Sequence, residues 1–151
     1  MKRVIATGSQ DFESLRKANA FYVDKTDLIR DWWLGYDSVT LITRPRRFGK
    51  TLNMSTLNCF FSNQYANRGE LFEGLKVWES PEMREQQGKW PVLFLSFANI
   101  KQTNWENTRC SLNQLISDVY GPYRTMLQDP LFRMISGSFF SRSHALTFLI
   151  S

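Results

Sequence analysis

The sequence predicts an α/β fold, a P-loop NTPase-like parallel sheet flanked by helices. Three observations support this fold class. Residues 39–43 suit a buried strand, and residues 91–97 form a continuous apolar run with a proline at its start. Segments with helical spacing of apolar residues lie between and after these runs. A Gly-Lys-Thr tripeptide at 49–51 joins the first predicted strand to the helix that follows. This layout is typical of a phosphate-binding loop.

The composition fits one folded domain spanning residues 1–151. Hydrophobic residues make up 42% of the chain and aromatic residues 15%, which argues against disorder and permits a sizeable core. The two cysteines, Cys59 and Cys110, are far apart, so we expect reduced thiols in a cytoplasmic protein. No apolar run approaches the roughly 18 residues of a membrane-spanning helix, so no membrane partner is expected.

The first clear helix is expected from about Thr26 to Gly35. Thr26 and Asp24 are both suited to cap its first turn, and Gly35 is suited to end it. Apolar residues recur inside it with helical spacing, so its two tryptophans are expected in the core, with a base-stacking platform as the alternative. The apolar stripe consists of Leu28, Ile29, Trp32 and Trp33.

Helical spacing also follows each predicted strand. A helix packed on the sheet is expected after the Gly-Lys-Thr tripeptide, and a longer one from about Glu106 to Leu127, broken or kinked at Gly121-Pro122. The last residues, from Ala145, have the apolar content of another helix, and we expect the charged stretch 79–90 to be mobile. The apolar residues of the helix after the tripeptide are Leu52, Met54, Leu57, Phe60 and Phe61.

The loop before that helix is the candidate nucleotide site. Backbone N–H groups at a helix N-terminus attract phosphate, and the helix dipole adds to this attraction. We expect Lys50 to reach the β- and γ-phosphates of a nucleotide and the Thr51 hydroxyl to ligate Mg²⁺. The phosphates would lie over the whole loop, which consists of Pro45, Arg46, Arg47, Phe48, Gly49, Lys50 and Thr51.

The loop departs from the usual phosphate-loop pattern at one position. The pattern G-x-x-x-x-G-K-[ST] has a glycine five positions before Gly49, where this chain has Arg44. That glycine allows backbone conformations that cost a residue with a Cβ about 1–2 kcal/mol. Pro45 also biases Arg44 toward an extended conformation. On spacing alone, a basic surface turn is therefore the alternative to a phosphate site.

Positive charge is concentrated around the same loop. The chain has a net charge of +5 and a pI of about 9.4, and no acidic residue occurs between Ser38 and Gly69. A phosphate tail and a nucleic-acid backbone attract such a surface alike, so a nucleic-acid-binding basic module is the alternative function. Arg46 and Arg47 could contact either ligand or form a solvated turn. The basic residues of this stretch are Arg44, Arg46, Arg47, Lys50 and Arg68.

One part of a hydrolytic site is missing from the sequence pattern. In nucleotide-hydrolysing P-loop proteins, an apolar strand ending in aspartate holds Mg²⁺. The run at 91–97 continues into Asn99 without an acid, and residues 147–151 contain none. Asp118 ends a short apolar string but belongs to a helical pattern, so we expect it to be a solvated helix residue. The sequence therefore carries half of a nucleotide-hydrolysing site and predicts weak nucleotide binding with little or no hydrolysis.

The loop and four other stretches resemble the bacterial AAA-ATPase-like family. The R-P-R-R-F-G-K-T string at 44–51 is highly specific, and the family generally has R-P-R-R in place of the first glycine. The resemblance covers about residues 8–127 and leaves 128–151 outside it. Its other stretches are D-F-E-S-L-R at 11–16, F-Y-V-D-K-T at 21–26, L-F-E-G-L at 71–75 and W-P-V-L-F-L-S-F at 90–97.

The resemblance implies a P-loop NTPase fold, ATP and Mg²⁺ as cofactors, and usually a C-terminal domain that resembles PD-(D/E)xK nucleases. The family's metal-binding strand, of the form L-I-D-E-Y-D, does not occur in this sequence. We therefore expect an N-terminal fragment, truncated before the Walker B strand, with 128–151 as its tail. A gene fragment without independent function is the remaining alternative. The residues at 24–26 either cap the following helix or contact the nucleotide.

Overall fold

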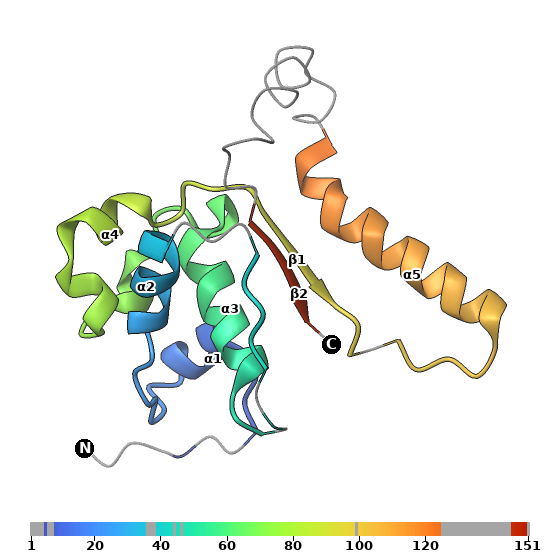
Figure 1. Cartoon of the computed structure of the whole chain (residues 1–151), viewed down its shortest axis with the longest axis horizontal. Helices are drawn as coiled ribbons and strands as arrows, with labels where there is room; N and C mark the ends of the chain where they lie inside the picture. Colours follow the sequence, from blue (N-terminus) through green and yellow to red (C-terminus); the bar gives the residue numbers. More distant parts are fainter. Residues whose placement is uncertain are drawn as a thin grey trace. The chain divides into compact units, whose positions relative to one another are not determined.

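The computed structural model describes residues 5, 8–35, 39–43, 45, 47–98 and 100–124 and, for the backbone alone, 146–150. The chain divides into two compact units, Met1–Lys89 and Trp90–Ser151 (Figure 1). The prediction of one domain over 1–151 stays a prediction. Among the described residues, no helix combines the length and the apolar character needed to cross a membrane.

The first unit is built from short helices and contains the candidate loop. Helix α3 begins with the last two residues of this loop, Lys50 and Thr51, and packs against α1 (Figure 1). In chain order, the elements are α1 (Phe12–Lys17), α2 (Asp27–Gly35), α3 (Lys50–Phe61), the 3₁₀ helices η1 (Asn63–Tyr65), η2 (Gly69–Phe72) and η3 (Lys76–Glu79), and α4 (Pro81–Gln86).

Aromatic side chains form the core of this unit. Phe72 stacks on Phe12 with ring centroids 5.1 Å apart and meets Phe60 edge-on at 5.0 Å. Phe60 in turn meets Phe61 edge-on at 5.0 Å. All four rings are fully buried. Pairs of this kind contribute about 0.5–1.5 kcal/mol beyond the burial of their area, so the cluster joins α1 and α3 to η2.

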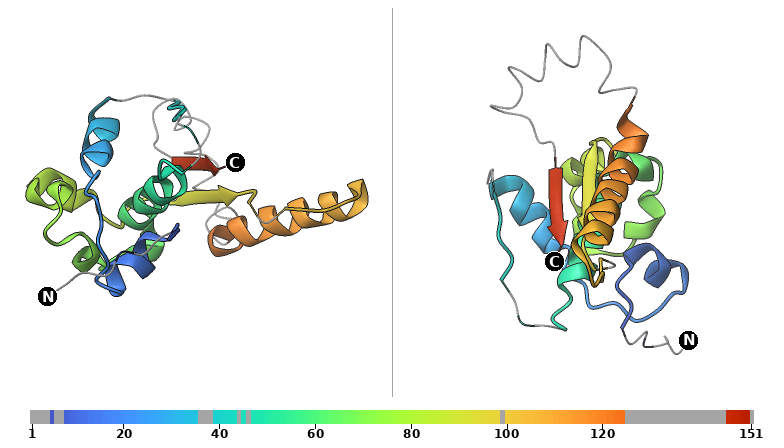
Figure 2. Two further views of the ribbon diagram at one scale, coloured as in Figure 1. Left: turned by 90° about the horizontal axis from the view of Figure 1, so that it is seen from below. Right: turned by 90° about the vertical axis from the view of Figure 1, so that its right-hand side faces the viewer.

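The helix expected from Thr26 is α2, which begins at Asp27 and ends at Gly35 as predicted. Trp33 stacks on Phe61 of α3 at 5.4 Å, and Trp32 meets the same ring edge-on at 5.5 Å. The two tryptophans therefore pack against the core, as the apolar stripe predicted. Figure 2 gives two further views of α2 and α3.

Hydrogen bonds fix α1 to its neighbours at both ends. At the start, Asp11 accepts from the Ser14 N–H at 2.8 Å, and the Ser55 hydroxyl of α3 accepts from the Phe12 N–H at 3.0 Å. At the end, Arg16 donates to the backbone carbonyls of residues 71 and 73, at 2.7 Å each. The stretches 11–16 and 71–75, which both carry the family resemblance, are therefore in direct contact.

The second unit combines helix and strand. Its described elements are β1 (Val92–Ser96), α5 (Trp105–Tyr120), η4 (Gly121–Tyr123) and β2 (Leu146–Ile150). Strand β1 pairs with β2 in parallel (Figure 1). The Tyr123 hydroxyl accepts from the Val92 N–H at 3.2 Å and donates to the Val92 carbonyl at 3.1 Å, which fastens η4 to β1. This arrangement is compatible with an α/β class.

Three predictions from residue pattern agree with these elements. β1 lies inside the apolar run 91–97, and α3 follows the Gly-Lys-Thr tripeptide. α5 begins one residue before Glu106, and its regular α-helical part ends where Gly121 follows it, as expected for the Gly-Pro pair. The remainder of the predicted helix, 125–127, lies outside the described residues.

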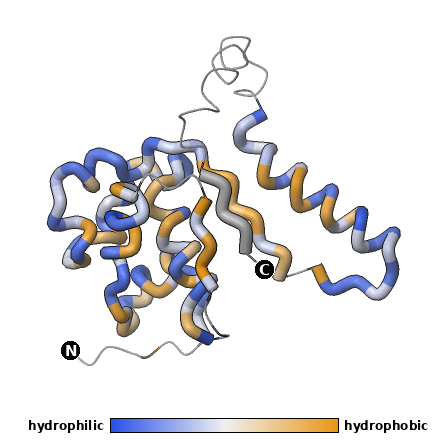
Figure 3. Tube along the Cα trace, in the orientation of Figure 1, coloured by the Kyte–Doolittle hydropathy of each residue, from blue (hydrophilic) through white to orange (hydrophobic). Residues whose placement is uncertain are grey.

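The predicted buried strand at 39–43 is wrong in this structure. These residues have no regular secondary structure, and Val39 and Leu41 are 86% and 82% exposed. Figure 3 shows that apolar residues predominate in this segment. A strand requires a neighbour for its N–H and C=O groups, and the sheet in the described part of the chain consists of β1 and β2. The composition of 39–43 could not indicate whether another strand lies beside this segment.

Two further expectations for short segments fail. The residues from Ala145 were expected to begin a helix, but 146–150 form strand β2. A short apolar run is compatible with helix or strand, and its pairing with β1 decides the outcome. The charged segment 79–90 contains the short helix α4, which begins at Pro81, a residue suited to the first position of a helix.

Candidate functional site

The loop before α3 ends in a helix N-terminus that no side chain caps. Gly49 precedes the helix with φ 75° and ψ 22°, a left-handed conformation that glycine adopts at little cost. Its carbonyl accepts the Asn53 N–H at 2.9 Å. The three N–H groups before Asn53, those of residues 50–52, have no partner within the helix, and the first turn contains no acidic residue. This geometry favours an anion.

The structure locates most of the predicted loop residues. Lys50 and Thr51 are the first two residues of α3 and are half-buried. Pro45, Arg47 and Phe48 are exposed, whereas Gly49 is half-buried. Arg46 lies outside the described residues, as does Arg44. No hydrogen bond or ion pair joins the described side chains of this loop to one another.

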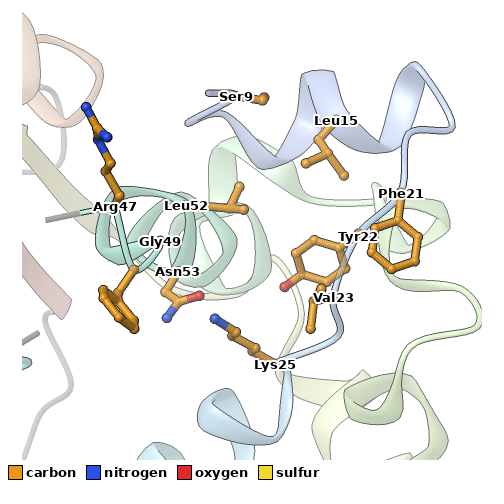
Figure 4. A pocket seen from close by; sticks show the side chains of 11 residues that line it. Ser9, Leu15, Phe21, Tyr22, Val23, Lys25, Arg47, Gly49, Leu52 and Asn53 are labelled. Carbon is orange, nitrogen blue, oxygen red and sulfur yellow. The ribbon is translucent and has the colours of Figure 1, made fainter. Parts of the chain in front are cut away.

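Arg47 adopts a backbone conformation that is unusual for a residue with a Cβ. Its φ of 71° lies in the left-handed region, which costs about 1–2 kcal/mol. Such strain persists where the surrounding structure imposes it, and it is frequent at binding loops. In Figure 4 the Arg47 side chain points away from the space between Lys25 and Asn53.

A groove of about 310 Å³ lies beside the loop. It is bounded by α1 and the residue Ser9, by the extended segment 21–25, and by the loop with the first turns of α3 (Figure 4). Lys50 and Thr51 are absent from its lining, so the groove adjoins the helix N-terminus and does not enclose it. The lining residues are Ser9, Leu15, Phe21, Tyr22, Val23, Lys25, Arg47, Phe48, Gly49, Leu52 and Asn53.

Sequence reasoning missed one polar residue of this groove, Asn53. Asn53 is only 8% exposed, and in Figure 4 its amide and the Lys25 ammonium group point toward each other. Burial raises the pKa of the nearby Tyr22 hydroxyl, although a hydrogen bond with Thr56 opposes this rise. The residue type gave no signal, because polar residues such as Thr51, Ser55 and Thr56 occur in the same helix. Only the groove, which Tyr22 and Lys25 also line, sets Asn53 apart from them.

Asp24 and Thr26 join their segment to η3. The Asp24 carboxylate accepts from the Thr26 N–H at 2.9 Å, the Thr26 hydroxyl at 2.7 Å and the Lys76 N–H at 2.9 Å. The Thr26 hydroxyl accepts from the Val77 N–H at 3.1 Å, and Thr26 is fully buried. We call these four residues the 24–77 clasp. Their bonds serve tertiary structure, whereas the sequence predicted a helix cap or a nucleotide contact.

The clasp also affects ionisation. Partial burial of Asp24 opposes its charged form, but the hydrogen bonds from Thr26 and from the Lys76 N–H outweigh burial, so the pKa of Asp24 is lowered. Its carboxylate therefore remains charged at neutral pH and is occupied by three donors. Asp24 is thus a structural residue of this unit.

Thr51 offers one ligand of the kind that Mg²⁺ uses. Mg²⁺ prefers oxygen ligands and is usually bound by one or two protein groups together with substrate phosphates and water. The Thr51 hydroxyl, in the first turn of α3, fits this role, and no carboxylate lines the adjacent groove. Asp118 is exposed on α5 and accepts from the Gln114 amide at 2.7 Å, which confirms it as a solvated helix residue.

Comparison with known proteins identifies a family. The family model described as a predicted AAA-ATPase matches residues 6–147, which include the loop, segment 21–25 and the 24–77 clasp. Neither the curated proteins nor the solved structures provide a match. Membership of such a family indicates a nucleotide-binding module. Since the family match spans nearly the whole chain, the protein belongs to the predicted AAA-ATPase family.

Proposed function

We propose that this protein is an ATP-binding P-loop module whose phosphate site is the loop 45–51. The observation that carries the proposal is the uncapped N-terminus of α3, preceded by Gly49 in the left-handed conformation. Free N–H groups, the helix dipole and a first turn without acids all favour a phosphate group there. Membership of a predicted AAA-ATPase family supports ATP as the nucleotide.

Each residue of the first turn has a role in this proposal. The N–H groups of residues 50–52 donate to phosphate oxygens, and Lys50 neutralises charge on the β- and γ-phosphates. The Thr51 hydroxyl ligates Mg²⁺, with phosphate oxygens and water as the other ligands. When bound, Mg²⁺ neutralises charge on the phosphates. The paired strands β1 and β2 would belong to a larger parallel sheet of the P-loop type.

We expect the chain to bind ATP without efficient hydrolysis. Strand β1 is followed by Phe97 and Ala98 and not by an acid, and Asp118 lies exposed on a helix. These positions supply no carboxylate that could hold the metal or orient water beside the phosphates. Cys59 and Cys110 are both free thiols, which fits the reducing cytoplasm.

Calorimetric titration of Mg²⁺-ATP tests the site. Removing the Lys50 ammonium group removes a charged hydrogen bond, so Lys50→Ala should weaken affinity by about tenfold or more. Lys89→Ala removes an exposed lysine from the same unit and should bind like the wild type. Equal ATP affinity in the wild type and in Lys50→Ala would refute the proposed site. Phosphate release that is lost in Lys50→Ala would instead refute the expectation of little hydrolysis.

A nucleic-acid-binding module is the second candidate. It is favoured by the absence of acids between Ser38 and Gly69 and by the exposed Arg47 beside the loop. Binding of a single-stranded oligonucleotide should then weaken steeply with salt, with a slope of about 0.7 per contacted phosphate. Competition separates the candidates, because ATP at saturating concentration displaces an oligonucleotide only if both occupy the loop.

A further inference from the structure

Asn53 is a largely buried residue that borders the groove, with an amide whose hydrogen-bonding capacity is open to a ligand there. Its side chain lines the groove beside the loop, and the residue is 8% exposed. Its backbone N–H is bonded to the Gly49 carbonyl, but within the described part of the chain its side-chain amide has no hydrogen-bond partner. Because the residue borders the groove, a ligand there could accept a hydrogen bond from this amide.

Lys25 brings a positive charge to the same place. It lines the groove and extends toward Asn53 (Figure 4). The acids nearest to it in sequence are engaged elsewhere: Asp24 in the 24–77 clasp, and Asp27 in an ion pair with Lys76 at 2.7 Å. No salt bridge involves Lys25 among the described residues, and no acid lines the groove. Its charge is therefore available to an anion.

The clasp holds Lys25 in position. Asp24 and Thr26, on either side of it, are bonded to the backbone of Lys76 and Val77. The backbone at Lys25 is thus fixed from both sides, while its side chain remains free to face the groove. Preorganisation of this kind lowers the entropic cost of binding. It also gives the F-Y-V-D-K-T stretch a physical role.

We propose that Lys25 and Asn53 are phosphate-binding residues that contact the triphosphate of the nucleotide from the groove, next to the loop. This inference rests on the proposed ATP-binding function. Lys25 brings three donors and no acceptor, and the Asn53 amide adds two more donors beside its one acceptor oxygen. Together with the N–H groups at the start of α3, they form a surface rich in donors. Such a surface matches the oxygens of a phosphate chain better than the mixed donor and acceptor edge of a base.

The dimensions of the groove favour a small ligand over a nucleic-acid strand. A volume of about 310 Å³ lies in the range of small-molecule sites. Single-stranded nucleic acid needs a basic track that extends over several nucleotides, whereas Lys25 and Arg47 are the cations of this groove. Apolar residues such as Leu15 and Val23 complete its walls. The groove therefore suits one end of a nucleotide.

Titrations with two probes test this proposal on the whole chain. Mg²⁺-ATP and inorganic tripolyphosphate should both bind Lys25→Ala about tenfold more weakly than the wild type. Lys25→Arg keeps the charge and should restore most of the affinity. Asn53→Ala should weaken both probes by about threefold to tenfold, with thermal melts of the free protein to confirm folding. Lys17→Ala is the matched control, because Lys17 is exposed and paired with Glu13 away from the groove.

Four results would overturn the inference, and they differ from one another. Wild-type affinity in Lys25→Ala and Asn53→Ala, with loss in Lys50→Ala, would leave the loop site intact and refute only the groove contacts. If Lys25→Ala bound ATP more weakly but bound tripolyphosphate like the wild type, Lys25 would contact the nucleoside and not the phosphates. If Lys25→Ala bound an oligonucleotide more weakly but bound ATP like the wild type, Lys25 would contact nucleic acid. A wild type that binds neither probe would refute the proposed function as well.

Discussion

Neighbouring residues of segment 21–26 have opposite surroundings. Thr26 is fully buried and bonded to Val77, and Asp24 is bonded to the Lys76 N–H. Lys25 lies between them and faces the groove. One short stretch therefore serves both stability and the proposed ligand contact. Substitutions at adjacent positions should separate these two properties.

The two cysteines should differ in their reactivity. Burial raises the pKa of the Cys59 thiol to about 12, whereas Cys110 is exposed on α5. Since the thiolate is the nucleophile, Ellman's reagent at about pH 8 should modify one thiol rapidly in the native protein and two after unfolding. The absorbance of the released thiolate measures the number of modified thiols in the native and in the unfolded protein. Cys110→Ser should abolish the rapid phase, and a rapid phase that persists in this variant would contradict the assignment.

At the scale of elements, the 24–77 clasp joins the segment before α2 to η3. The Thr26 hydroxyl accepts from the Val77 N–H and donates to Asp24. Val77 is 2% exposed, so its N–H finds no replacement in solvent. Removing this one hydroxyl would leave a buried donor without a partner.

Thr26→Val should therefore lower the free energy of unfolding by about 1–3 kcal/mol, the usual cost of an unpaired buried group. Urea denaturation measures it. Thr26→Ser keeps the hydroxyl and should lose less, and Thr40→Val changes an exposed threonine and should alter stability by less than about 0.5 kcal/mol. A Thr26→Val variant as stable as Thr40→Val would show that the clasp contributes little.

The elements differ in how far local pattern could predict them. The stripe through Ile29 and Trp33 gave α2, and the Gly-Lys-Thr tripeptide gave the start of α3, because both signals lie within a few residues. Residues 39–43 and 146–150 are short apolar runs whose state depends on a distant pairing partner. Pattern therefore assigned the first a strand and the second a helix, and both assignments were wrong.

At the scale of the whole chain, contacts between distant segments explain what the sequence could not reveal about the site. Arg16 reaches the carbonyl of residue 71, Asp24 reaches the N–H of residue 76, and segment 21–25 faces residues 47–53 across the groove. Gly49, Lys50 and Thr51 were predictable because they are consecutive. Asn53 was not, because its importance depends on Lys25, which is far away in sequence. Family motifs can be found in a sequence, but the sequence does not show which of their residues are in contact in the folded protein.

The exposed segment 39–43 has a consequence for the behaviour of the protein in solution. V-T-L-I-T carries no charge and no proline, and its residues favour extended structure. With Val39 and Leu41 exposed, it has the features of a segment that adds to strands of other molecules and starts aggregation. Concentrated protein should therefore self-associate through this segment.

A single charge at this segment should suppress the self-association. Light scattering during slow warming should show a later onset of aggregation for Leu41→Lys than for the wild type. Leu34→Lys is the control, since it adds the same charge at a leucine that is 53% exposed on α2. A delay of equal size in both variants would indicate a general effect of net charge. A delay confined to Leu41→Lys would identify 39–43 as the segment through which the protein aggregates.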